Sequence, residues 1–311
     1  MQAQINEYMY YLLKKEGLMN GAEENTSTAF FNIGPFEKNI YEGIRTPSYY
    51  TKWLSVFEYL NNPLYVYVDS IEYKTLFENV RRNSQHKTKI ILINREDIWG
   101  FSLRENISSI FSDPDYPKVV GKTTNAEYTC AMHAKFDVML KSVNDNKFQT
   151  KYFAWLDIGY YRDTVNSTNQ FKIYLPPCFD DSRVSYNELY TPRERTIQQI
   201  ITNEEVWVGG GIFLAEKNVM RKWVQDYMYF VEKFIQLGWI SSDQEVIYAM
   251  RQPSIHKKLG KRRVAIQEYN ANRIFGLDPW FGLGYLCRKE LEPLDNKTFN
   301  YLVERHLVIT Q

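Results

Sequence analysis

The sequence predicts an α/β fold with a doubly wound, mostly parallel central sheet flanked by helices. Three strand-like runs, at residues 26–33, 64–68 and 89–94, alternate with segments whose apolar residues recur at helical spacing. Strands that alternate with helices are typical of parallel sheets, because each crossover helix covers one face. A fourth run, at residues 153–156, is entirely apolar, which indicates a central strand buried on both faces.

The remaining elements follow from local patterns. Residues 47–59 repeat apolar side chains at three- and four-residue steps and begin with Pro47, which suits the first turn of a helix. Residues 206–214 form an apolar run interrupted by glycines, which we interpret as another strand. The other expected helices cover residues 72–82, 125–143 and 217–237, with one more beginning after a Ser242 or Asp243 cap, and a late strand covers residues 263–266.

The chain shows no clear internal boundary. Residues 166–199 have weak periodicity, and we expect a long excursion there, with a hairpin, that forms a binding surface. We therefore expect one domain over residues 26–311, preceded by a helical arm over residues 1–25. No apolar run approaches the roughly 20 residues that cross a bilayer, and the amino terminus lacks the pattern of a signal peptide. These observations predict a soluble, cytoplasmic protein.

The composition excludes some classes of partner. Lys and Arg number 38 against 37 Asp and Glu, so the formal charge of +1 provides no general attraction to nucleic acid. The three cysteines form no CxxC pair and do not indicate a zinc site. Aromatic residues make up 16% of the chain, which suits stacking on a carbohydrate or a base and suits an aromatic core equally well.

Asp157 directly follows the buried run at residues 153–156, and Gly159 comes two residues later. In open α/β sheets, ligands bind outside the carboxyl ends of the strands, where this acid would lie. Mn²⁺ and Mg²⁺ need only one or two protein carboxylates, because phosphate oxygens and water complete their shell. Asp157 is therefore a candidate metal ligand beside a phosphate leaving group, with Gly159 leaving room for the ligand. The alternative is an aspartate that caps the next turn.

Two further features are candidates for contacts with a sugar. Gly209, Gly210 and Gly211 lack β-carbons, so a flat sugar or ribose ring could pack directly against the backbone there. A plain β-bulge is the alternative. Asp243 begins a predicted helix, where it could act as a general base, accept hydrogen bonds from sugar hydroxyls, or serve only as the helix cap.

The strongest local positive charge lies at residues 256–263, which include His256 and Lys261. This stretch could hold a pyrophosphate, with His256 as a further metal ligand, or it could be a solvated basic loop. The other candidate cations are Arg45, Lys135 and Arg162. Each of them could equally be an ordinary surface charge.

Four segments carry a resemblance when they are taken together. They are residues 36–69, with Arg45 and the strand that ends at Asp69, the Trp-Leu-Asp-Ile-Gly run at 155–159, the Trp-Val-Gly-Gly-Gly run at 207–211 and the Asp-Gln-Glu run at 243–245. In this combination the chain resembles the HtrL/YibB family. That family is regarded as glycosyltransferases with a GT-A-like nucleotide-sugar fold, and its bacterial members are associated with lipopolysaccharide-core genes.

The resemblance implies a glycosyltransferase that moves a sugar from a nucleotide-sugar, expected to be a UDP-sugar, to a glycan, a lipid-linked glycan or another hydroxyl acceptor. It implies Mn²⁺ or Mg²⁺ at Asp157, with Asp69 near the nucleoside. Peripheral contact with a membrane would fit a lipid-linked acceptor. The other expected roles are neutralisation of the diphosphate by Lys135, Arg162 and Lys261, donor binding at Arg45, a sugar-pocket floor at Gly209, Gly210 and Gly211, and hydroxyl contacts at Asp243.

One position departs from the pattern of GT-A enzymes, which usually carry Asp-x-Asp where this chain has Asp157-Ile158-Gly159. An expected carboxylate is missing, so metal binding is weaker, completed differently or absent. Two other functions therefore stay open. One is a nucleotide- or carbohydrate-binding protein that keeps the fold without catalysis, and the other is a glycoside hydrolase that uses Asp157 and Asp243.

Overall fold

The structure of the protein is a computed structural model that describes residues 24–39, 43–117, 125–260, 263–270 and 278–291. The expected helical arm lies outside these residues, apart from positions 24 and 25, which begin the first strand. Lys261 of the basic stretch also lies outside them. The expectation of one domain over residues 26–311 stays a prediction.

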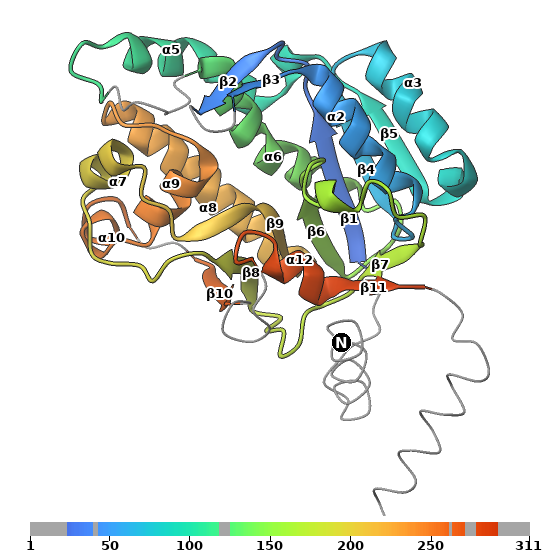
Figure 1. The fold of residues 1–311 in the computed structure, drawn as a ribbon. Helices are drawn as coiled ribbons and strands as arrows, with labels where there is room; N and C mark the ends of the chain where they lie inside the picture. The colour runs from blue at the N-terminus through green and yellow to red at the C-terminus, as the bar shows by residue number, and fades with distance from the viewer. Residues whose placement is uncertain (1–23, 40–42, 118–124, 261–262, 271–277, 292–311) are drawn as a thin grey trace, which may run out of the picture.

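A seven-stranded sheet forms the centre of the molecule (Figure 1). Its strands are Glu24–Phe30 (β1), Leu64–Val68 (β4), Thr88–Leu92 (β5), Tyr152–Leu156 (β6), Arg183–Glu188 (β8), Val208–Glu216 (β9) and Ala265–Tyr269 (β10), in the spatial order β10-β8-β9-β6-β1-β4-β5. β1 pairs in parallel with β4 and β6, β4 with β5, and β8 with β10. β9 is antiparallel to both of its neighbours, β6 and β8. The predicted α/β fold is confirmed, with a sheet that is mixed and mostly parallel.

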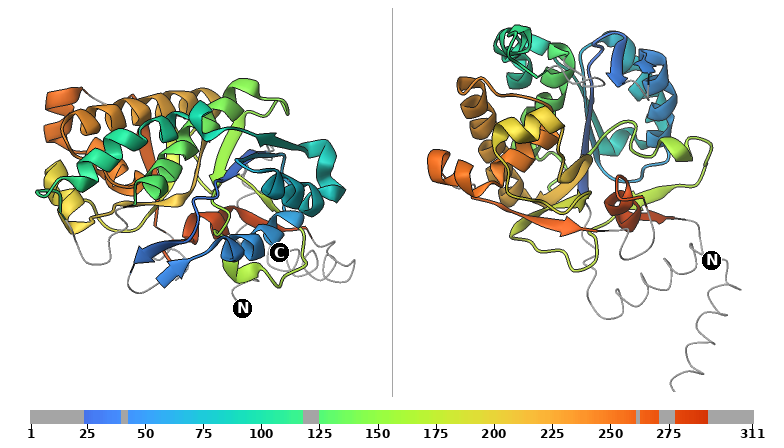
Figure 2. Two further views of the ribbon diagram at one scale, coloured as in Figure 1. Left: turned by 90° about the horizontal axis from the view of Figure 1, so that it is seen from above. Right: turned by 60° about the vertical axis from the view of Figure 1, so that its left-hand side comes forward.

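Helices cover both faces of this sheet (Figure 2). They are Pro47–Leu54 (α2), Ile71–Val80 (α3), Trp99–Ser102 (α4), Arg104–Ser112 (α5), Ala126–Asp145 (α6), Ile197–Asn203 (α7), Lys217–Gln236 (α8), Asp243–Met250 (α9), Pro253–Leu259 (α10) and Gly282–Cys287 (α12), with short 3-10 turns at Ser55–Glu58, Arg82–Lys87, Arg95–Asp97 and Arg162–Thr164. Successive side chains of a strand point to opposite faces. In β6, Phe153 and Trp155 therefore belong to the core under α6 and α8, whereas Ala154 and Leu156 belong to the core under α2 and α3.

Both ends of α6 are fixed by local contacts. At the start, the Asn125 side chain accepts a hydrogen bond from the Tyr128 backbone N–H at 3.2 Å. At the end, Asn146 adopts a left-handed conformation, with φ of 36°, and stops the helix. Because the two ends are set, Lys135 occupies a defined place in the middle of the helix, one residue before the fully buried Phe136.

The excursion expected at residues 166–199 differs from the prediction. Its strands, Phe171–Ile173 (β7) and β8, do not pair with each other as a hairpin would, because β7 pairs with Arg288–Glu290 (β11) and β8 lies inside the central sheet. In β8, the polar residues Ser185 and Asn187 are as fully buried as Tyr186, which lies between them. Because this buried strand contains polar residues, it does not form an apolar run in the sequence.

A small hairpin near the amino-terminal half was not predicted. Phe36–Asn39 (β2) pairs in antiparallel fashion with Gly43–Arg45 (β3) and forms a two-stranded sheet of its own. The hairpin ends at Arg45, two residues before α2 begins, and so places this arginine beside the first turn of that helix.

Candidate functional site

A cavity of about 680 Å³ lies at one edge of the central sheet. Its walls include Asn32 and Gly34, which follow β1, and Asp157 and Gly159, which follow β6. β1 and β6 are parallel, so this is the carboxyl edge, where ligands bind in open α/β sheets. The cavity thus lies at the edge where the sequence predicted a ligand.

The cavity brings seven of the predicted site residues together. They are Arg45, Lys135, Asp157, Arg162, Gly210, Gly211 and Asp243. Of the other predicted residues that the structure describes, Asp69, Gly209 and His256 are not part of its lining.

Lys135 links the two acids of the cavity. Its ammonium nitrogen lies 2.9 Å from Asp243 Oδ2 and 3.5 Å from Asp157 Oδ1, and it donates a hydrogen bond to the Gly210 carbonyl at 3.2 Å. Asp157 Oδ1 also accepts a hydrogen bond from the Trp155 indole N–H at 2.6 Å. Residues of α6, α9 and β9, and the residue that follows β6, therefore meet at one ammonium group.

The members of this cluster differ in exposure. The side chains of Lys135 and Asp243 are each 4% exposed, whereas the side chain of Asp157 is 36% exposed. Burial by itself lowers the pKa of Lys135, but the charges of Asp157 and Asp243 outweigh burial and raise this pKa above its ordinary value. Lys135 is therefore a permanent positive charge at neutral pH, and Asp157 is the more open of the two acids that it contacts.

The glycines of β9 make room for neighbouring side chains. A β-carbon at Gly210 would lie 2.4 Å from Asp243 Oδ2, and one at Gly211 would lie 2.8 Å from Tyr160 Cδ2. The space that we expected to receive a sugar ring is thus occupied by Asp243 and Tyr160. Glycine at position 210 is what allows the Asp243 carboxylate to reach Lys135.

Trp53 of α2 and two arginines that lie over its ring form an aromatic and positively charged part of the cavity. The guanidinium carbons of Arg45 and Arg162 lie 5.2 and 5.8 Å from the centre of its ring, and that of Arg162 lies 4.9 Å from the centre of the Phe281 ring. A β-carbon at Gly159 would lie 2.8 Å from the Trp53 ring. The room that Gly159 was predicted to leave for a ligand is therefore filled by an aromatic side chain.

Asp69 and His256 make contacts outside the cavity. Asp69 accepts a hydrogen bond from the Asn32 backbone N–H at 3.0 Å and forms an ion pair with Arg95 at 2.6 Å. Asp69 thereby holds the loop after β1, which does line the cavity. The His256 Nε2–H donates at 2.7 Å to the carbonyl of Met250, which is the last residue of the helix that begins at Asp243.

The residues around Asp157 do not fit the predicted Mn²⁺ or Mg²⁺ site. These cations take oxygen ligands from carboxylates, phosphates and water. Here a lysine ammonium and an indole N–H both contact Asp157 Oδ1, and His256 lies outside the cavity. Across the described part of the chain, no three His, Cys, Asp or Glu side chains gather in a way that could hold a metal ion.

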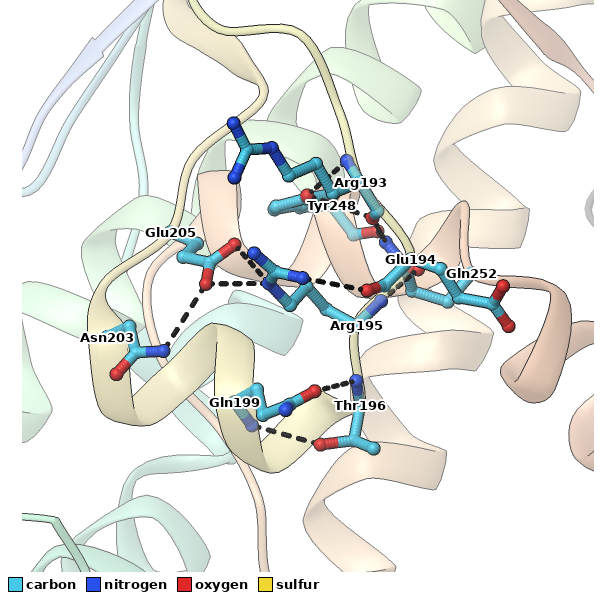
Figure 3. Close-up of polar contacts among 9 residues, drawn as sticks. All are labelled: Arg193, Glu194, Arg195, Thr196, Gln199, Asn203, Glu205, Tyr248 and Gln252. Atoms are coloured by element: carbon cyan, nitrogen blue, oxygen red, sulfur yellow. Dashed lines mark hydrogen bonds and ion pairs between the residues drawn. The ribbon is translucent and has the colours of Figure 1, made fainter.

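The segment between β8 and β9 forms another wall, to which it contributes Tyr190, Glu204 and Val206. This segment is fastened to α9 (Figure 3). The Tyr248 hydroxyl accepts a hydrogen bond from the Arg193 backbone N–H at 2.8 Å and donates one to the Arg193 carbonyl at 3.0 Å. Because α9 begins at Asp243, one helix supports both this wall and the buried acid.

The same segment is closed on itself by side-chain contacts. Arg195 Nε donates to Glu205 Oε1 at 2.9 Å within the segment, and the Arg195 backbone N–H donates to Gln252 Oε1, outside the segment, at 2.9 Å. Thr196 and Gln199 form a capping box that starts α7, which satisfies two backbone N–H groups at the helix start. Residues 195–205 therefore form a compact unit rather than an open loop.

Several aromatic residues of the site were not predicted as site residues. Trp53, Trp155 and Tyr160 are three of them, and all three line the cavity. The available signal was the pair Gly159 and Gly211, since each lacks a β-carbon where an aromatic ring lies. A sequence pattern cannot say whether such a space holds a ligand or a side chain from elsewhere in the chain.

The fold and the cavity define an α/β protein with a polar, aromatic-lined cavity at the carboxyl edge of a mixed sheet. Among the described helices, none combines the length and the apolar character that crossing a bilayer requires. The HtrL_YibB family, described as a bacterial protein of unknown function, matches residues 23–254. The chain therefore belongs to the HtrL_YibB family. A comparison with curated proteins found no match.

Proposed function

We propose that this protein is a glycosyltransferase that moves a sugar from a nucleotide-sugar, in the first instance a UDP-sugar, to a hydroxyl of a glycan or lipid-linked glycan. The observation that carries the proposal is the uneven distribution of charge in the cavity. Arg45 and Arg162 lie over Trp53, whereas Asp157 and Asp243 lie around Lys135. A nucleotide-sugar has matching parts, namely an aromatic base, an anionic diphosphate and a sugar rich in hydroxyls.

The arginine side of the cavity suits the diphosphate. Guanidinium groups bind phosphate oxygens through paired N–H donors and also stack on aromatic rings. Arg45 and Arg162 come from separate parts of the chain, and both stack on the same Trp53 ring. Two positive charges close to one ring make this part of the cavity favourable for an anion.

The Asp157 side of the cavity suits hydroxyl groups. A carboxylate accepts hydrogen bonds through both oxygens, and the Trp155 and Lys135 contacts made by Oδ1 fix the orientation of the group. The partly exposed Asp157 is therefore placed to accept hydrogen bonds from hydroxyls in the cavity. The buried Asp243 acts through Lys135 as a positioning residue.

In the proposed reaction, the oxygen of the acceptor hydroxyl bonds to the anomeric carbon of the donor sugar. The bond between that carbon and the phosphate oxygen breaks, and the nucleoside diphosphate leaves with the electron pair. Arg45 and Arg162 stabilise the charge that develops on this leaving group. Asp157 accepts the proton of the acceptor hydroxyl.

A non-catalytic binding protein is the second candidate. The observation that favours it is the contact of Lys135 with both acids, which leaves less negative charge available for proton transfer. A hydrolase with Asp157 and Asp243 as its two carboxyl groups is less well supported. Such an enzyme assigns an acid to one carboxyl and a base or nucleophile to the other, and here both contact the same ammonium group.

A thermal-shift panel of nucleoside diphosphates and UDP-sugars tests the proposal, because a ligand that binds only the native state raises its melting temperature. UDP should raise the melting temperature of the wild type and of Arg82→Ala, whose side chain is exposed and outside the cavity. The shift should be smaller in Arg45→Ala and in Arg162→Ala. If no nucleotide raises the melting temperature, the transferase proposal fails. Release of UDP in the presence of glycan acceptors then separates a transferase from a binding protein.

A further inference from the structure

The protein contacts of the Lys135 ammonium group match its bonding capacity. An ammonium group has three N–H donors and no acceptor. Three oxygens from three other parts of the chain surround this one, namely Asp243 Oδ2 at 2.9 Å, the Gly210 carbonyl at 3.2 Å and Asp157 Oδ1 at 3.5 Å. The group is therefore held by the protein itself rather than by a substrate.

The position of the ammonium between two acids is the position that a bridging divalent cation would take. Such a cation binds carboxylate oxygens from more than one element and neutralises them. Lys135 does this for Asp157 and Asp243 from inside the chain. A metal ion at the same oxygens would have to lie next to a fixed positive charge, which repels it.

The burial of the pair makes the arrangement permanent. Lys135 and Asp243 are each 4% exposed, so neither exchanges its partner for water without a large desolvation cost. Gly210 adds a second constraint, because a β-carbon there would lie 2.4 Å from Asp243 Oδ2 and would force this carboxylate away. Residue types at positions 135, 210 and 243 thus depend on one another.

We infer that Lys135 is the built-in cation of this site and that the site binds a nucleoside diphosphate without a divalent metal ion. The inference rests on the proposed function in one respect, that the ligand is a nucleoside diphosphate. In this inference, side chains supply the positive charges of the site. Lys135 lies at the acids, and Arg45 and Arg162 would lie at the phosphates.

Titration of the full chain with Mn²⁺ alone tests the inference directly. The signal of free Mn²⁺ in electron paramagnetic resonance is followed for the wild type and for Asp157→Asn. We expect both proteins to leave the same amount of Mn²⁺ free. If the wild type removes one equivalent of Mn²⁺ from solution and Asp157→Asn does not, Asp157 is a metal ligand and the inference is wrong.

A gain-of-binding variant provides the second arm. Lys135→Met removes the ammonium and leaves two carboxylates together, so it should bind Mn²⁺ at least about tenfold more tightly than the wild type, since metal affinity follows the available oxygen ligands. The gain should disappear in Lys135→Met combined with Asp243→Asn. A folded Lys135→Met protein with no gain would contradict the inference. If Lys135→Met does not fold, the comparison of the wild type with Asp157→Asn still decides.

The role of the metal in nucleotide binding is measured separately. The thermal shift produced by UDP should be the same in EDTA and in Mn²⁺, and a shift that requires Mn²⁺ would overturn the inference. The absence of any shift by nucleotides would instead count against the proposed function. The Mn²⁺ titration contains no nucleotide, so its result stands in either case.

Discussion

The Asp243 carboxylate lies 2.9 Å from the Lys135 ammonium, although the two residues are 108 positions apart in the chain. The contact joins the first residue of α9 to the middle of α6. Both groups are buried, so the loss of either leaves the other without water and without its partner. This pair therefore supports the fold at the same point at which it shapes the cavity.

Lys135→Met should lower the free energy of unfolding by about 3–5 kcal/mol, the usual cost of breaking a buried pair from one side. Lys141→Met on the same helix is the matched control. Lys141 is 39% exposed and pairs with Asp137 one turn away, so its loss should cost about 0–1 kcal/mol. Urea unfolding of the two variants measures the difference. Equal effects would show that the Lys135 pair is not a buried ion pair in solution.

Gly210→Ala should destabilise the protein by about 1–3 kcal/mol, the typical range for an overpacked site. The added carbon would meet Asp243 Oδ2 at 2.4 Å. Gly209→Ala is the control, because its β-carbon would find its nearest neighbour at an ordinary 3.6 Å. We expect Gly209→Ala to change the stability by less than about 1 kcal/mol. A tolerated Gly210→Ala, with UDP binding unchanged, would contradict the close fit of Asp243 against β9.

The stability of the protein should fall in mildly acidic solution because of His133. Burial lowers the pKa of His133 from 6.5 to about 4. Between these values the unfolded chain binds a proton that the folded chain does not, so the stability is complete above pH 6.5 and is lost as the pH falls toward 4. The loss should reach about 3 kcal/mol, at 1.36 kcal/mol for each pKa unit.

His133→Gln should remove this pH dependence, and His86→Gln, at an exposed position, should keep it. The free energy of unfolding measured at several pH values between 4 and 7 provides the test. Glutamine can still bond with the Tyr227 hydroxyl, which lies 2.7 Å from His133 Nδ1, so the comparison isolates the titration. Parallel pH profiles for the wild type and His133→Gln would exclude His133 as the cause.

Tyr248→Phe should loosen the wall formed by the segment between β8 and β9. The hydroxyl serves both the N–H and the carbonyl of Arg193, and its removal should cost about 1–3 kcal/mol, since two backbone groups lose a partner. Hydrogen exchange should rise at residues 190–196. Tyr229→Phe is the control, because Tyr229 is 44% exposed and its hydroxyl contacts only the Leu259 carbonyl among the described residues. Unchanged exchange at residues 190–196 would show that Tyr248 does not hold this wall.

Parts of the fold could be predicted because local sequence encodes them. The runs that became β4 and β6 are apolar and wholly buried, and such runs identify strands covered on both faces. The start of α6 is encoded by Asn125, whose side chain caps the helix. β8 was not predicted as a strand, because the buried polar residues Ser185 and Asn187 interrupt its apolar pattern. The pairing of β7 with β11 joins residues more than a hundred positions apart, and no local pattern records such a contact.

The candidate site could be predicted as a set of residues but not as an arrangement. Asp157 and Asp243 were recognisable from their places at a strand end and a helix start. The role of Lys135 was not recognisable, because a lysine beside an apolar helix face is indistinguishable from a surface charge until its partners are known. Gly159 and Gly210 indicated that something comes close to the backbone. Only the folded chain shows that Trp53 and Asp243 fill those spaces.

We expect the cavity to bind a nucleoside diphosphate with cations supplied by the chain. Isothermal titration of UDP into the full chain in the presence of EDTA tests it most directly, with Arg82→Ala as the control. We predict one binding site in the wild type and in Arg82→Ala, and a loss of at least about tenfold in affinity when Arg45 and Arg162 are both replaced by alanine, since each guanidinium–phosphate contact contributes on the order of 1 kcal/mol or more. Absence of binding in EDTA with recovery in Mn²⁺, or equal affinity in the doubly substituted protein, would contradict the account.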